Sequence, residues 1–225
     1  MIFAVDHIVF AVTAPDRARM ADELLGRGFA RIPLDLDFSE IGAASESFAT
    51  AGGGFGELVY ETEPGRAPAV WFDEVPRVIG VGFSSDDFER DVAAWDESEG
   101  MWLMDEDKVL SDGSILNIHA AGPHPHLEDF YVFVMDTTEL PYADRGALAR
   151  LESLTFEGER AFEWRQRLAG WLAAEPAANG LRVGDIELLF VDGKQPNVRL
   201  SPLFAVPFAA DPIPLAAGEI AFIRR

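Results

Sequence analysis

Hydrophobic and polar residues alternate near the start of the chain, over residues 5–12. The alternation places His7 on one face with Val9, whereas Ile8 and Phe10 point to the opposite face. A period of two residues is typical of a β-strand that lies between two different environments. We therefore predict a strand here that carries a histidine on one of its faces.

A helix is predicted directly after this strand. Pro15 stands at a position typical of a first helical turn, and Met20 and Leu24 recur at helical spacing over residues 17–25. The glycines within residues 26–28 end the helix, because glycine readily adopts the backbone conformation found at helix ends.

A second alternating segment, residues 56–62, carries a carboxylate. Glu57 shares a face with Phe55 and Val59, whereas Leu58 points away. An unpaired carboxylate among apolar neighbours costs free energy, so we expect Glu57 to line a wet cleft, to pair with a cation or to bind a metal. An imidazole and a carboxylate on the concave face of one sheet would together form half of a metal site.

The order of a strand, a helix and further strands then recurs. A strand is predicted at residues 78–83, a helix after Ser84, and two strands at residues 114–120 and 130–135. A third and fainter round is predicted from a strand at 151–156, a helix at 160–173 and strands at 185–191, 198–206 and 219–223. Internal repetition at a spacing of roughly 70 residues is the main clue to the fold.

This repetition predicts an α+β fold of βαβββ-type modules, in which curved mixed sheets form a cleft and helices cover the outer faces. We divide the chain into a first module at residues 1–63, a Pro-rich linker at 64–76, a second module at 77–136, a connector at 137–150 and a third, degenerate module at 151–225.

The overall charge restricts the partners of the chain. Its 225 residues include 18 Lys and Arg against 39 Asp and Glu, which gives a formal net charge of −21. Nucleic acid and anionic membranes would repel such a surface, so neither is expected as a partner. The absence of cysteine excludes disulfides, thiolate nucleophiles and cysteine-based metal sites. Because the start is unlike a signal peptide and no apolar run reaches membrane-spanning length, we expect a cytoplasmic protein.

Four features of the sequence belong together. They are Asp6-His7-Ile8-Val9 followed by Pro15-Asp16 and a helix ending in residues 24–29, Gly53-Gly54 leading into Gly56-Glu57-Leu58, a new strand and helix from Val78, and Gly122-Pro-His-Pro125. In this combination the chain resembles the vicinal oxygen chelate superfamily, and within it the glyoxalase-like proteins, the group of glyoxalase, bleomycin-resistance and dioxygenase domains.

The resemblance implies a divalent metal, such as Zn, Ni, Fe or Mn, held in a cleft between paired modules. Members of the superfamily take ligands from the first and the last strand of each module, and His7 and Glu57 match these positions in the first module. A metal with open positions chelates two adjacent oxygens of a substrate and stabilises the charge that develops there. The resemblance thus implies a lyase, an isomerase or a dioxygenase that acts on a small oxygenated molecule.

The second module departs from this pattern. Val78 or Ile79 stands where a second histidine is expected, so the usual set of four ligands is incomplete. Glu187 lies in a predicted strand that echoes the strand of Glu57, where it either completes the site as a third metal ligand or is a solvated glutamate at a sheet edge.

Three further residues are candidates for contact with a bound molecule. His119 shares a predicted strand face with Asn117, and Trp71 and Trp102 lie outside clear helices, where a tryptophan can line a pocket. No catalytic residue is assigned, because the chain has no Gly-x-Ser-x-Gly elbow. No nucleotide cofactor is expected, since no phosphate-binding glycine loop opens a helix.

Two other functions fit the same residues. A metal-free protein could bind a small molecule through aromatic and apolar contacts, like the drug-sequestering members of the superfamily. A degenerate module could instead serve as a scaffold or as one half of a homodimer. The sequence leaves all three readings open.

Overall fold

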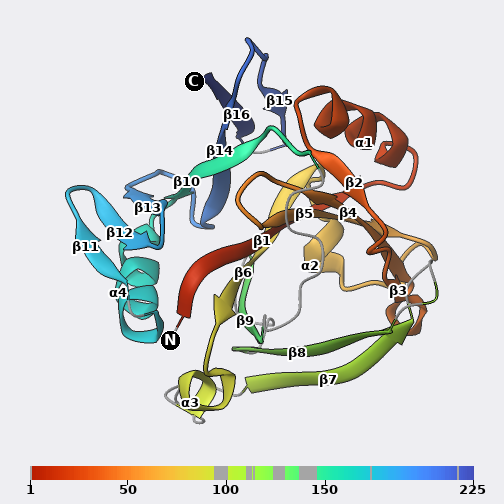
Figure 1. Cartoon of the computed structure of the whole chain (residues 1–225), viewed down its shortest axis with the longest axis horizontal. Helices are drawn as coiled ribbons and strands as arrows, with labels where there is room; N and C mark the ends of the chain where they lie inside the picture. Colours follow the sequence, from red (N-terminus) through yellow and green to blue (C-terminus); the bar gives the residue numbers. More distant parts are fainter. Residues whose placement is uncertain are drawn as a thin grey trace.

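The first part of the chain folds into one large, curved β-sheet. The computed structural model describes residues 2–93, 101–109, 113, 115–123, 130–136, 146–172, 174–216 and 218–225. The strands of this first sheet are β1 (Ile2–Val12), β2 (Ala30–Ile32), β3 (Asp37–Phe38), β4 (Ala43–Ala49), β5 (Phe55–Glu61), β6 (Arg77–Ser85), β7 (Met101–Val109), β8 (Ile115–Pro123) and β9 (Tyr131–Asp136). Their order is β2-β4-β5-β1-β6-β9-β8-β7, with β3 paired to β4. Figure 1 shows the sheet curving so that β4 and β5 lie opposite β7 and β8.

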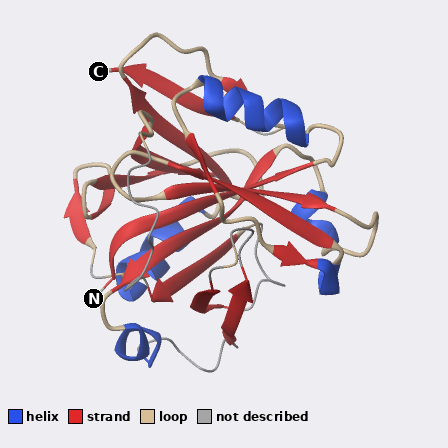
Figure 2. Ribbon diagram, turned by 45° about the vertical axis from the view of Figure 1, so that its right-hand side comes forward, coloured by secondary structure: helices blue, strands red, loops and turns tan. Residues whose placement is uncertain are grey.

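The second part forms a smaller sheet, and few helices accompany the two sheets (Figure 2). The strands of the second sheet are β10 (Arg150–Glu157), β11 (Glu175–Ala177), β12 (Gly180–Val183), β13 (Ile186–Val191), β14 (Arg199–Val206), β15 (Ile213–Pro214) and β16 (Glu219–Arg224). Their order is β11-β12-β13-β10-β14-β16-β15. The helices are α1 (Arg17–Gly26), α2 (Ala69–Phe72), α3 (Phe88–Ala93), α4 (Ala161–Trp171) and a short 3-10 helix, η1 (Ser39–Ile41).

The first sheet is built around a central antiparallel pair, β1 and β6, in which His7 pairs with Gly82 and Val9 with Gly80. Each central strand has a parallel neighbour, β5 beside β1 and β9 beside β6. Beyond each parallel neighbour lies an antiparallel strand, β4 or β8. The sheet therefore consists of two βαβββ units related by a pseudo-twofold axis, and the predicted α+β class with curved mixed sheets is confirmed.

The second sheet repeats this plan. The segment β10-α4-β11-β12-β13 has the same order of elements, with β13 parallel to β10 and β12 antiparallel to β13. Strand β14 then pairs antiparallel with β10, as β6 does with β1, and β16 lies parallel to β14. Residues after 198 thus follow the same strand pattern with no helix among the described residues between β14 and β16.

The two faces of β1 contribute to two different cores, as the alternation predicts. Ile8 and Phe10 belong to the larger core, which joins the first sheet to the second and also contains Leu24 of α1 and Trp164 of α4. Val9 belongs to the smaller core on the concave face of the first sheet. Burial of opposite faces of one strand in two cores explains why its register is fixed, since a slip of one residue would exchange the faces.

Several elements differ from the sequence-based expectation. Strand β7 was not predicted, and neither were the short strands β11, β12 and β15. Within the proposed linker, residues 64–76, the structure forms helix α2, whose Trp71 packs on the concave side of the sheet rather than on an outer face. His124, part of the Gly122-Pro-His-Pro125 motif, lies outside the described residues. None of the described helices is long and apolar enough to cross a membrane.

Candidate ligand cavity

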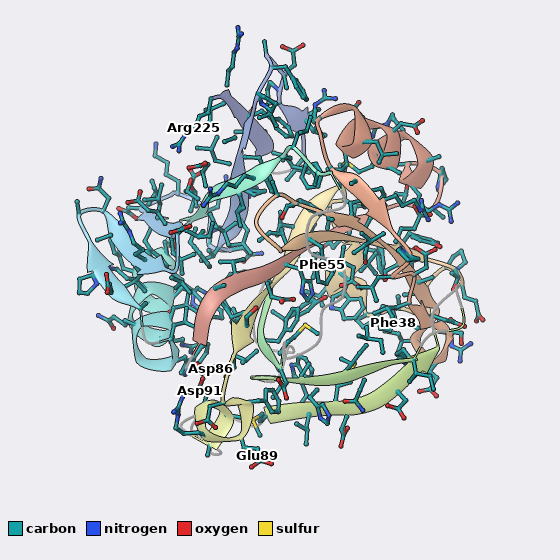
Figure 3. All side chains as sticks on the ribbon, in the orientation of Figure 1. Phe38, Phe55, Asp86, Glu89, Asp91 and Arg225 are labelled. Atoms are coloured by element: carbon teal, nitrogen blue, oxygen red, sulfur yellow. The ribbon has the colours of Figure 1, made fainter. Side chains whose placement is uncertain are left out.

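The concave face of the first sheet encloses a cavity of about 280 Å³, whose wall is almost entirely apolar. Strands from both units of the sheet and helix α2 contribute to it. Figure 3 shows Phe55 near the centre of the molecule and Phe38 on the side of β3. The rings that line the cavity belong to Phe38, Phe55, Trp71, Trp102, Tyr131 and Phe133, and the rest of the wall is mostly aliphatic and methionine side chains.

The aromatic rings form a continuous wall. Trp71 stacks on Tyr131 with ring centroids 5.6 Å apart, and Tyr131 stacks on Phe133 at 5.5 Å. Trp102 packs against Phe133 at 6.0 Å. Because neighbouring rings fix one another in these arrangements, the cavity presents rigid aromatic surface to a bound molecule.

The polar end of the cavity is formed by His7 and Glu57. The His7 ring is held between Phe55, on which it stacks at 4.3 Å, and Phe133, whose edge it meets at 4.7 Å. Its Nε2 lies 3.7 Å from Oε2 of Glu57. The sequence predicted that these two side chains share a concave face, and both line this cavity.

Asp6 orients the imidazole from behind. Its carboxylate accepts a hydrogen bond of 2.8 Å from Nδ1 of His7 and another of 2.9 Å from the Ser84 hydroxyl. Neighbouring residues of a regular strand point to opposite faces, but the β1–β6 pairing shifts register between Val5 and His7, so Asp6 can reach the adjacent ring. With Nδ1 donating to Asp6, Nε2 is the ring atom directed at Glu57.

Glu57 is a buried carboxylate with one unsatisfied oxygen. The residue is only 7% exposed, and its Oε1 has no hydrogen-bond partner. Ser45 and Ser47 on β4 also have buried hydroxyls without partners, and Ser47 pairs in register with Glu57. A polar group buried in this way costs free energy, and a bound molecule or water that satisfies it recovers that cost.

Tyr131 is affected by the same carboxylate. Burial of its phenol raises the pKa well above the ordinary value of 10.0, and the negative charge of Glu57 raises it further. Tyr131 is therefore a neutral phenol throughout the neutral pH range and contributes no charge to the cavity.

The positions of the second unit that correspond to His7 and Glu57 hold residues without a metal-binding side chain. The pairing of β1 with β6 is symmetric about Ile8, so the pseudo-twofold axis passes there and relates His7 to Gly80. Because β5 lies parallel to β1 as β9 lies parallel to β6, the same axis relates Glu57 to Phe133. The position equivalent to His7 is therefore residue 80, and not residue 78 or 79 as the sequence predicts. In the described part of the chain no group of three or more His, Asp and Glu side chains is placed to hold a metal. The donor set therefore does not fit the four-ligand site that the resemblance implies.

Two of the predicted site residues lie away from the cavity. Glu187 is on β13 of the second sheet, where it forms an exposed ion pair of 2.9 Å with Arg182. It is not among the residues that line the cavity with His7 and Glu57, and its role as a third ligand stays a prediction. His119 points away from the cavity, because Ile118 on the same strand lines the cavity and successive side chains alternate; its Nδ1 lies 3.2 Å from Asp105.

The two predicted tryptophans, Trp71 and Trp102, do line the cavity. The rings of Tyr131 and Phe133 were missed by sequence reasoning. The signal that could have found them is the alternation of large residues in β9, which lie opposite the glycines of β6. A glycine is needed there because a Cβ added at Gly80 would lie 2.9 Å from the Tyr131 ring.

No protein-family model and no curated protein sequence matches this chain. Among solved structures, a hypothetical protein from Staphylococcus aureus is similar over 100% of both chains, with a TM-score of 0.71 and 10% identity. A fusion protein described as xylose isomerase-like TIM barrel/4-hydroxyphenylpyruvate dioxygenase matches 92% of this chain and 37% of its own length, with a TM-score of 0.60 and 12% identity.

The methylmalonyl-CoA epimerase of Mycobacterium tuberculosis is also among the similar structures, at 15% identity over 61% of this chain and 90% of its own, with a TM-score of 0.42. The chain shares its fold with the first two of these structures, and its order of βαβββ units is the one that the sequence predicts. At such low identity the likeness extends to the fold alone.

Proposed function

We propose that this protein binds a small, largely apolar molecule in the concave cavity and does so without a metal. The observation that carries the proposal is the unsatisfied Oε1 of Glu57 at the end of an otherwise aromatic and aliphatic cavity of about 280 Å³. Cavities of this composition, with few polar groups among apolar walls, are typical of small-molecule sites.

The arrangement of the polar groups supports this proposal. A ligand with one hydrogen-bond donor would satisfy Glu57, while the rest of its surface packs against the rings of Trp71 and Tyr131. Since Asp6 and Phe55 already fix the His7 ring, the polar end is organised before binding, and little ordering has to accompany binding.

Thermal unfolding in the presence of a chelator tests the proposal. Uncharged phenols and aryl alcohols, together with aryl amines, form the panel, because a ligand that binds only the folded state raises the melting temperature. We expect at least one class to raise it, less in a Glu57→Gln variant, and equally in a Glu187→Gln variant, whose exposed ion pair lies in the second sheet. Absence of any shift across the panel would overturn the proposal.

A metal-dependent lyase, isomerase or dioxygenase is the second candidate. The specific observation in its favour is that His7 and Glu57 approach within 3.7 Å, with Asp6 bound to the far nitrogen of the ring, as an outer carboxylate often is in metal sites. Metal analysis of protein purified without chelator distinguishes the two candidates. Near-stoichiometric metal that is lost in both His7→Ala and Glu57→Ala would favour the enzyme.

A further inference from the structure

We infer that the molecule bound in this cavity is an organic cation, an ammonium group carried on an apolar or aromatic body, with its charge beside Glu57. The inference rests on the proposed binding function and names the chemical class of its ligand. Three properties of the cavity lead to it: the carboxylate at its polar end, the aromatic rings of its wall and the absence of lysine and arginine from its described wall.

The polar end holds two carboxylates beside a single imidazole. Asp6 and Glu57 flank the ring of His7, at 2.8 Å and 3.7 Å. Asp6 is satisfied by the ring and by Ser84, whereas Oε1 of Glu57 has no partner. The uncompensated charge therefore lies at the carboxylate that lines the cavity, where a cation would balance it.

The aromatic wall favours the same kind of ligand. The face of an aromatic ring is the negative end of its quadrupole, so several rings around one space attract a cation, most strongly where water is excluded. Trp71, Tyr131 and Phe133 form a stacked series, and Phe55 and Trp102 border the space near it. A primary ammonium also offers three N–H donors, and Oε1 of Glu57, which lines the cavity, has no hydrogen-bond partner.

An anionic ligand is disfavoured by the same features. No lysine or arginine is among the described residues that line the cavity, so neither is present to balance a carboxylate or phosphate that meets Glu57. The chain as a whole has a net charge of −21, which raises the local concentration of cations near the protein and lowers that of anions.

Three ligands of similar size and different charge test the inference: 2-phenylethylamine, which is a cation at neutral pH, 2-phenylethanol and phenylacetate. Isothermal titration calorimetry on the full chain gives the three dissociation constants, at low and at raised ionic strength. We expect the amine to bind at least about tenfold more tightly than the alcohol and phenylacetate to show no binding. Raised salt weakens a general attraction to an acidic surface but preserves the preference at a buried carboxylate.

Variants locate the preference. In Glu57→Gln the amine should lose its advantage over the alcohol, while alcohol binding persists as a sign that the cavity is intact; in Glu187→Gln all three dissociation constants should be unchanged. Equal or tighter binding of the alcohol or of phenylacetate would overturn the inference and leave the proposed binding function standing. A preference for the amine that survives in Glu57→Gln would also overturn it. Binding of none of the three ligands would count against both.

Discussion

Replacing Glu57 with methionine should make the folded protein more stable. Glu57 is 7% exposed and its Oε1 has no hydrogen-bond partner, so the folded state bears the cost of desolvating a polar group without recovering it. That cost is about 1–3 kcal/mol for a neutral group and more for a charged one. Methionine has a similar length and no polar atom to satisfy, and its neighbours Phe55 and Val59 are apolar. We therefore expect the free energy of unfolding to rise by about 1–3 kcal/mol.

Glu46 provides a matched control, because it is buried to the same extent, at 6% exposure, but is fully paired. Its carboxylate lies 2.6 Å from Arg31 and 3.2 Å from Arg17. Glu46→Met should therefore lower the free energy of unfolding, by about 1–2 kcal/mol since both arginines are partly exposed. Urea unfolding of both variants measures the two values. A loss of stability in Glu57→Met as large as that in Glu46→Met would refute the claim that Glu57 is uncompensated.

Three further predictions concern the same cavity. Gly82→Ala should destabilise the protein by about 1–3 kcal/mol, because the added Cβ would lie 2.9 Å from the His7 ring; Gly26→Ala, with nothing within 4 Å of its added Cβ, should show no loss in the same urea assay. The phenolate absorbance of Tyr131 should appear only well above pH 10.0, and at a lower pH in Glu57→Gln than in the unchanged protein. Because this tyrosine ionises at a lower pH in the unfolded chain than in the folded protein, the free energy of unfolding should fall as the pH rises above 10.0. Added Zn or Ni should leave the melting temperature unchanged, since two donors hold a metal weakly; a rise that is lost in His7→Ala would contradict this.

The repeating fold could be predicted because strand periodicity and helix ends are local properties of the sequence. The segment around His7 has strict alternation, and the structure places its two faces in two cores. Strand β7 (Met101–Val109) gave a weaker signal, because acidic residues and Lys108 interrupt its alternation on an edge strand. Edge strands are often charged on exposed positions, which hides them from pattern-based prediction.

The site could be predicted only in part, because half of it depends on register across strands that are distant in sequence. The pairing of His7 with Glu57 follows from two local alternations. The position of Glu187 outside the cavity does not follow from its sequence, since its strand has the same local pattern as that of Glu57. The two strands differ only in the sheet to which they belong. His119 was misplaced because residues on both faces of β8 are compatible with the alternation until its partners are known.

The contrast between the two halves of the first sheet explains why this cavity differs from a four-ligand metal site. Gly80, which the axis relates to His7, is the only residue that its surroundings admit, because a Cβ there would come within 2.9 Å of the Tyr131 ring. A histidine introduced at position 80 would therefore overlap that ring. Restoring a second histidine requires loss of the tyrosine as well, and with it the stacking on Trp71. A second histidine and the stacked rings would occupy the same space, so these two uses of the second unit exclude one another.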